Sequence, residues 1–185
     1  MLAAVKSDNV AAINALLARG MDVDSTDRSG TTLLMTASTL DRLGAAKALI
    51  AAKAKVNVRN QYGESALMMA AIRGHRPVVE LLAANGAEIN PPGWTPLMFA
   101  AIKGHEDIVR FLLDKGASID ASSENGTTAL MLAAKEGNLD TVLLLLERGA
   151  ATNLRNLAGA TALSLALEGG RKNVAAALIR AGAEQ

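Results

Sequence analysis

The sequence contains no cysteine, and this absence removes several classes of chemistry at once. Without a thiol there is no disulfide, no thiol nucleophile and no thiolate ligand for a metal ion. Aromatic residues are also scarce, with one Trp, one Tyr and two Phe in 185 residues. The hydrophobic half of the chain therefore consists mainly of small and aliphatic side chains. A core of this kind favours closely stacked helices over a barrel around a large cavity.

Neither sign of charge dominates, because 19 Lys and Arg residues face 18 Asp and Glu residues and leave a net charge of +1. With no long run of one sign, the sequence predicts neither a nucleic-acid partner nor an acidic membrane partner. No apolar run approaches the roughly 20 residues of a membrane-spanning helix. The opening residues "MLAAVKSDNV" do not form a signal peptide, since polar residues interrupt the apolar region early.

Two ladders of equivalent positions run through the chain. The first is the glycine that opens stretches such as "GESALMMA" and "GTTALMLA", with spacings of 33, 30, 33 and 33 residues at Gly30, Gly63, Gly93, Gly126 and Gly159. The second closes each unit, with spacings of 33, 33, 30, 33 and 33 residues at Gly20, Lys53, Gly86, Gly116, Gly149 and Gly182. Both ladders shorten at the same place, so the chain is built from internal repeats.

Each repeat has the same internal pattern. A glycine turn precedes a short apolar segment such as "SALMMAAIRG", and after a break a second one follows, such as "VVELLAANGA". Apolar residues recur at helical spacing in both segments. Each repeat is therefore predicted to be a helix, a tight turn, a second helix and a loop. Neither helix buries its apolar face alone, so the repeats must stack into an all-α solenoid.

The stretches "GWTPLMFAAIKGHEDIVRFLLDKGASID" at 93–120 and "GESALMMAAIRGHRPVVELLAANGAEIN" at 63–90 resemble ankyrin repeats. Weaker copies at 30–57, 126–153 and 159–185 and a partial copy at 2–24 extend this resemblance over the whole chain. It implies a single ankyrin-repeat domain over residues 1–185, with about six repeats. Their approximate bounds are 1–24, 25–57, 58–90, 91–120, 121–153 and 154–185.

The chain departs from the ankyrin pattern at several positions. The histidine that the family has after the turn Leu is replaced by Met35, Met68, Met98, Met131 and Ser164. We expect the methionines to fill this space as flexible apolar side chains. The second repeat has Asp41-Arg42 in place of the inter-helix Gly-His, and Lys53 in place of the closing glycine. Lys53 is thus expected to lie in a left-handed conformation with some local strain.

The loop before Gly93 is three residues shorter than its equivalents and contains Pro91 and Pro92, which leaves it too short for the usual hairpin finger. Trp94 follows it and is not shared with the other repeats. Two roles remain open for Trp94: it covers its own short loop, or it faces a partner. The variant pattern is similar to a group of bacterial ankyrin-repeat proteins, many of them exported. We therefore expect a periplasmic or exported location after removal of a leader, with the cytoplasm as the alternative.

No arrangement of residues points to catalysis or to a cofactor. His75 and His105 stand at equivalent positions between the two helices of their repeats, where a structural role at the start of the second helix is favoured over a metal site. The phosphate-binding, dinucleotide-binding and zinc-protease motifs are missing. The sequence therefore predicts a non-enzymatic protein with no catalytic residue, no cofactor and no metal.

The resemblance implies that a protein partner binds the concave groove formed by the loop tips and the first helices of the repeats. Aromatic residues, Arg and aliphatic neighbours are the composition of a binding hot spot. The predicted partner-binding residues are Leu40, Tyr62, Glu64, Ile72, Arg73, Trp94, Ile102, Lys103, Lys135 and Glu136. For Ile72 and Ile102, partial burial against the next repeat is the alternative. We expect a monomer that binds an unidentified protein; the alternative function is a structural, self-associating repeat protein.

Overall fold

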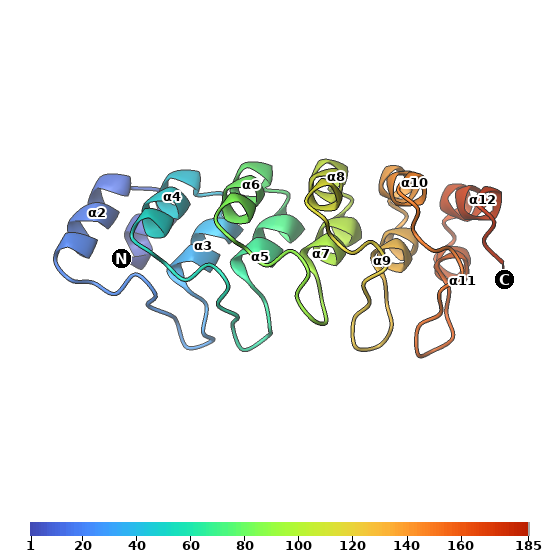
Figure 1. Cartoon of the computed structure of the whole chain (residues 1–185), viewed down its shortest axis with the longest axis horizontal. Helices are drawn as coiled ribbons and strands as arrows, with labels where there is room; N and C mark the ends of the chain where they lie inside the picture. The colour runs from blue at the N-terminus through green and yellow to red at the C-terminus, as the bar shows by residue number, and fades with distance from the viewer. Residues whose placement is uncertain (185) are drawn as a thin grey trace. The chain divides into compact units, whose positions relative to one another are not determined.

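The computed structural model describes residues 1–184, and every regular element in this part of the chain is an α-helix (Figure 1). The helices come in consecutive pairs. The first helices of the pairs are α1 (Leu2–Lys6), α3 (Leu33–Thr39), α5 (Ala66–Arg73), α7 (Pro96–Lys103), α9 (Ala129–Glu136) and α11 (Ala162–Glu168). The second helices are α2 (Val10–Ala18), α4 (Leu43–Ala51), α6 (Arg76–Ala84), α8 (Glu106–Asp114), α10 (Leu139–Glu147) and α12 (Lys172–Arg180). The predicted all-α class is confirmed.

Local sequence signals explain where the first helices begin and end. From α3 onward, each follows a Thr or Ser whose hydroxyl accepts a hydrogen bond from the backbone N–H three residues later. This N-cap satisfies one of the N–H groups that a helix leaves without a partner. Helices α5, α7 and α9 end at a glycine in the left-handed conformation, which reverses the chain into the second helix.

The chain divides into two compact units, Met1–Glu88 (unit 1) and the residues from Ile89 onward (unit 2). Within unit 1, α3 packs against α1 and α5, and α4 packs against α2 and α6. Within unit 2, α9 packs against α7 and α11, and α10 packs against α8 and α12. Each unit therefore has a row of first helices and a row of second helices (Figure 1). The core between the rows is made of Ala, Leu, Met, Val and Ile, as the composition predicts.

Four hairpin tips, which we call fingers, precede first helices; they comprise residues 27–31, 60–64, 123–127 and 156–160. Each is closed by two backbone hydrogen bonds, such as Asn60 N to Glu64 O at 3.1 Å and Gly63 N to Asn60 O at 2.9 Å. Within each unit the two fingers are also joined to each other, by Gln61 N to Ser29 O at 3.0 Å and by Leu157 N to Asn125 O at 2.9 Å.

The residue that precedes the second helix reaches back to the preceding repeat. The Arg42 Nε donates to the Lys6 carbonyl at 2.8 Å, and the His75 Nε2 lies 3.1 Å from the Thr39 carbonyl. In unit 2, Asn138 donates to the Ala101 and Ile102 carbonyls, and Arg171 to that of Lys135. These side chains satisfy carbonyls at the ends of first helices, which otherwise lack a partner in the chain.

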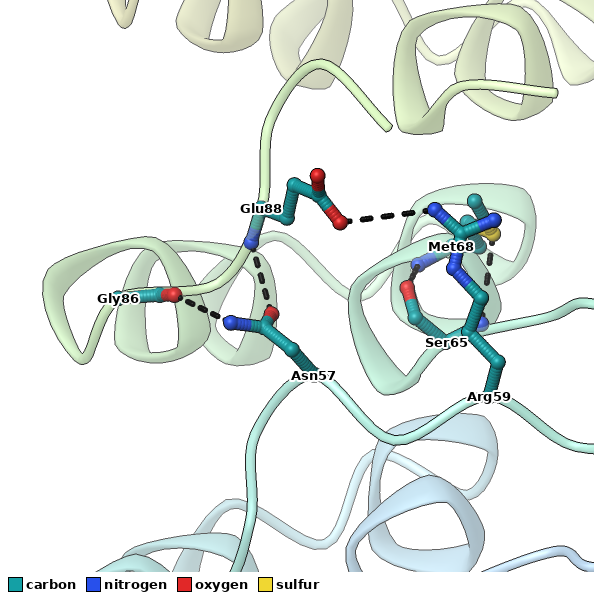
Figure 2. A network of polar contacts seen from close by, with 6 residues as sticks. All are labelled: Asn57, Arg59, Ser65, Met68, Gly86 and Glu88. Atoms are coloured by element: carbon teal, nitrogen blue, oxygen red, sulfur yellow. Dashed lines mark hydrogen bonds and ion pairs between the residues drawn. The ribbon is translucent and has the colours of Figure 1, made fainter. Parts of the chain in front are cut away.

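A further ladder joins each repeat to the loop after the next second helix. In unit 1, the Asn57 side chain donates to the Gly86 carbonyl at 2.9 Å and accepts from the Glu88 N–H at 2.9 Å (Figure 2). Asn90 and Asn153 make the same two bonds in unit 2. Asp24 and Asp120 stand at equivalent positions and each accept one backbone N–H, because a carboxylate has no proton to donate.

The methionines at the family's histidine position fill the core and, in unit 1, also act as acceptors. The Met68 sulfur lies 3.3 Å from the Ser65 backbone N, and the Met35 sulfur lies 3.4 Å from the Thr32 backbone N (Figure 2 shows the Met68 pair). A thioether is a weak acceptor. The expectation of a purely apolar filler is thus too simple for these two residues, whose sulfurs close a capping box.

Lys53 adopts the left-handed backbone conformation with a φ of 68°, as the repeat alignment predicts. Asp41, which replaces the inter-helix glycine, has a φ of 55°, and Asp8 in the first pair has a φ of 54°. A side chain in this region costs about 1–2 kcal/mol, and Asp is tolerated there better than Lys. The irregular backbone positions outside glycine all lie in unit 1.

Candidate interaction surface

The fingers and the first helices carry the predicted partner-binding residues. Tyr62 lies in the finger 60–64, and 71% of its surface is exposed. The finger itself is rigid, since the Asn60 side-chain oxygen accepts the N–H groups of Tyr62 and Glu64 at 2.9 and 3.0 Å. The Glu64 carboxylate in turn accepts from the Asn60 side-chain amide at 2.9 Å, so Glu64 is held within its own finger. Tyr62 is therefore an exposed aromatic on a fixed support.

Trp94 combines features of both roles predicted for it. Its ring centroid lies 5.4 Å from that of Phe99 in α7, with the ring planes inclined at 39°. It therefore packs on its own repeat, and Pro91 in the shortened loop is buried. At the same time 40% of the Trp94 surface is exposed. An aromatic pair that is fixed on one side and open on the other is suited to contact with a partner.

The remaining predicted residues lie at the ends of first helices. Leu40, at the end of α3, and Arg73, in α5, are exposed in unit 1, and Ile72 is half-buried. In unit 2, the pattern repeats with exposed Lys103 and half-buried Ile102 in α7, and with exposed Lys135 and Glu136 in α9. Leu40, Tyr62, Ile72 and Arg73 thus share unit 1, whereas Trp94, Ile102, Lys103, Lys135 and Glu136 share unit 2.

Sequence reasoning did not select three residues of the same side of unit 2. Leu157 in the finger 156–160 is 83% exposed, Leu167 in α11 is exposed, and Phe99 in α7 is half-buried. Repeat alignment places Leu157 at an exposed tip, and its apolar character there was the available signal. For Phe99 the contact with Trp94 is the decisive feature, and it follows from side-chain directions that the repeat pattern does not specify.

His75 is explained by its bond to the Thr39 carbonyl and by the Asp41 carboxylate 3.9 Å from its Nδ1. His105 occupies the corresponding position before α8. Within residues 1–184 there is no group of three or more His, Cys, Asp or Glu side chains that could hold a metal ion. No helix in the same residues has the length and apolar character needed to cross a membrane.

A hollow of about 390 Å³ lies in unit 1, between α1, the loop after α2 and the start of α3. Its lining is mainly apolar and includes Leu2, Met21 and Leu33. The polar groups there are used in local turns: the Ser25 hydroxyl donates to the Asp22 carbonyl at 2.7 Å, and Asp27 accepts from Ser29 and Thr31. These bonds do not arrange convergent groups toward a ligand.

Electrostatic perturbation in the fingers is confined to one carboxylate. Hydrogen bonds from the Ser29 hydroxyl and the Thr31 backbone N–H lower the pKa of Asp27 below its ordinary value. On the second-helix side of unit 2, a hydrogen bond to the Glu106 carboxylate raises the pKa of Arg110. Both shifts arise from bonds that hold local structure.

The repeat geometry agrees with the family that the sequence matches. The family model described as ankyrin repeats (3 copies) matches four overlapping stretches, residues 1–92, 42–123, 90–156 and 119–185. The chain belongs to the ankyrin-repeat family. Ankyrin-repeat domains in general are non-catalytic scaffolds that mediate protein–protein interactions, so the surface described above is the natural place to look for function.

Among solved structures, the crystal structure of the human ASB11 ankyrin repeat domain is similar to this chain, with a TM-score of 0.91. The two sequences are 26% identical over an alignment that covers 99% of this chain and 83% of the human one. A comparison with the sequences of curated proteins finds no match. The ankyrin assignment thus rests on the family model and on the fold.

Proposed function

We propose that this ankyrin-repeat protein is a non-catalytic interaction module that binds a protein partner through its fingers and first helices, along the groove side of the repeats. The proposal rests chiefly on the exposure of Tyr62 and Trp94 on rigid supports. With only one Trp, one Tyr and two Phe in the chain, two exposed aromatics on this side are a strong compositional bias. Rigid supports lower the entropy cost of binding, since little ordering is needed.

Site-specific photocrosslinking tests this proposal. A photoreactive benzophenone side chain is placed at Tyr62 or at Trp94, and the protein is expressed in the organism that encodes it. Leu143, exposed on α10 in the row of second helices, is the matched control position. We expect both test positions to crosslink the same protein and Leu143 to leave it unlabelled. Equal labelling from all three positions, or no crosslink from Tyr62 and Trp94, would contradict the proposed surface.

The captured protein then permits a quantitative test. Trp94→Ala combined with Ile102→Glu removes the aromatic contact and adds a charge beside it. We expect at least a tenfold loss of affinity, about 1.4 kcal/mol, with helical content and cooperative unfolding unchanged. Unchanged affinity would remove Trp94 and Ile102 from the site.

Self-association is the second candidate function, and the last helix pair supplies the observation that favours it. Leu154, Leu157, Leu167 and Ile179 are all exposed there. We nevertheless expect a monomer, because these side chains are spread over a finger and two helices. Light scattering over a wide concentration range distinguishes the two, since a molar mass that rises with concentration would favour self-association.

We further propose that the helix pairs represent six ankyrin repeats in one domain, of the type found in bacteria. An exported location is proposed on the same resemblance, with the cytoplasm as the alternative. A single cooperative unfolding transition of the whole chain is the expected result for one domain. Fractionation of cells that express the natural gene separates the two locations.

A further inference from the structure

The first helices of unit 2 carry an apolar row that continues from Trp94. Phe99 in α7, Leu132 in α9 and Leu165 in α11 occupy equivalent positions 33 residues apart. Because α9 packs against both α7 and α11, these positions follow one another across the unit. Phe99 and Leu165 are half-buried, and Leu132 retains 8% exposure. Packed helices lie about 8–10 Å apart, which sets the spacing of the row.

A row of charges runs beside the apolar row, one helical turn further along. Lys103 ends α7, Lys135 and Glu136 end α9, and Glu168 ends α11. All four side chains are exposed, and none forms an ion pair within residues 1–184. By contrast, Arg110 on the second helices is paired with Glu106 at 2.7 Å. The sign changes from positive at α7 to negative at α11.

Fold stability explains only half of this charge row. Cations at the C-terminal end of a helix interact favourably with the helix dipole, which accounts for Lys103 and Lys135. Anions at the same end are opposed by the dipole, at a cost of about 0.3–1 kcal/mol each. Glu136 and Glu168 are the last residues of their helices and carry that cost. Their presence points to a role outside the fold.

We propose that this side of unit 2 binds an extended segment of a partner protein in the polyproline II conformation, with an acidic residue at one end and a basic residue at the other. This inference rests on the proposed function and specifies its partner. The acidic end lies at Lys103 and Lys135, and the basic end at Glu168. A polyproline II helix advances about 9.3 Å per turn of three residues, which matches the spacing of the helices. Apolar residues at every third position therefore meet Phe99, Leu132 and Leu165 in turn.

The Trp94–Phe99 pair favours the same occupant. Proline-rich segments dock on surfaces lined by aromatic rings and lose little entropy on binding, since their conformation is already formed. The ring pair stands at the α7 end of the row with Trp94 open on one side. An α-helical partner fits less well, because successive turns advance about 5.4 Å and every second turn would fall between rows.

Selection from a phage-displayed library of random peptides about 12 residues long, roughly four turns of polyproline II, tests the proposal with the intact chain as bait. The wild-type protein is expected to enrich peptides with prolines, apolar residues at every third position, and opposite charges at the two ends. The double variant Lys103→Glu with Lys135→Glu should select a basic residue where the wild type selects an acidic one. Lys172→Glu, on α12, is the matched control and should leave the selected pattern unchanged.

A second variant separates binding from stability. Glu136→Lys with Glu168→Lys is expected to raise the resistance to urea, since it removes two unfavourable dipole interactions. It should nevertheless weaken the best wild-type peptide about tenfold, as measured by fluorescence anisotropy.

Three outcomes would overturn the inference: no enriched peptide, a helical seven-residue apolar pattern, or a charge preference that the variants do not move. Each leaves the photocrosslinking result standing, because Tyr62 and Trp94 report on any partner of the proposed surface.

Discussion

The two units repeat the same architecture and depart from its regularity in different ways. Unit 1 places three side chains other than glycine in the left-handed region, at Asp8, Asp41 and Lys53, whereas in unit 2 every residue described there is glycine. Unit 2 instead buries a hydroxyl without a partner, that of Thr141 in α10. The backbone bonds survive substitution in unit 1: Ala54 N donates to Leu49 O at 3.0 Å, as Ala87 N does to Leu82 O at 3.0 Å. Repeat geometry is therefore set by the hydrogen-bond pattern, and glycine only lowers its cost.

The largest effect is expected from the ladder that joins the repeats, where the two units agree. Asn57→Ala removes two backbone contacts in unit 1, at a cost of about 2 kcal/mol, and Asn153→Ala does the same in unit 2. Asp120→Ala removes one bond and should cost about half as much. Urea unfolding followed by circular dichroism measures all three. Equal losses for Asn57 and Asp120 would show that the number of bonds does not decide the cost.

Lys53→Gly is expected to stabilise the protein by about 1 kcal/mol, because the left-handed conformation then carries no side-chain penalty. The reverse change at the equivalent position in unit 2, Gly149→Lys, should cost a similar amount. A Cβ at Gly149 would have no atom within 4 Å, so the loss is conformational and not steric. Shifts of opposite sign in the urea midpoint are the expected pair of results, and a neutral Lys53→Gly would place no strain at Lys53.

Thr141→Val tests the irregularity of unit 2. The equivalent residues Ile108 and Val174 are apolar and buried, so valine suits this site. Removing a buried hydroxyl that has no partner should stabilise the fold by roughly 1 kcal/mol or slightly less. Val174→Thr creates the same defect in α12 and should lower the urea midpoint by a similar margin. If both variants behave like wild type, the hydroxyl is not a cost to unit 2.

The sequence predicts much of the fold because each repeat states its own pattern again. The glycine ladders locate the turns, and the apolar periodicity yields the helix pairs and the left-handed conformation of Lys53. The Asn57 and Asn90 ladder has its own 33-residue signal, at residues 24, 57, 90, 120 and 153, but its bonds are known only from the structure. The contact of Trp94 with Phe99 belongs to one repeat alone, so no periodicity predicts it.

The smallest effect concerns acid, and it distinguishes one finger from the other three. Asp27 holds the finger 27–31 through a carboxylate, whereas Asn60, Ser123 and Asn156 hold theirs with uncharged groups. The pKa of Asp27 is lowered in the folded state, so its contribution to stability is present above the ordinary value of 3.8 and is lost as the pH falls through the lower folded value. A carboxyl titration by NMR should give a midpoint below 3.8 for Asp27. Ser29→Ala removes the strongest of these bonds and should move that midpoint upward toward 3.8. A midpoint that Ser29→Ala leaves in place would mean that the backbone N–H of Thr31 alone sets the charge state of this finger.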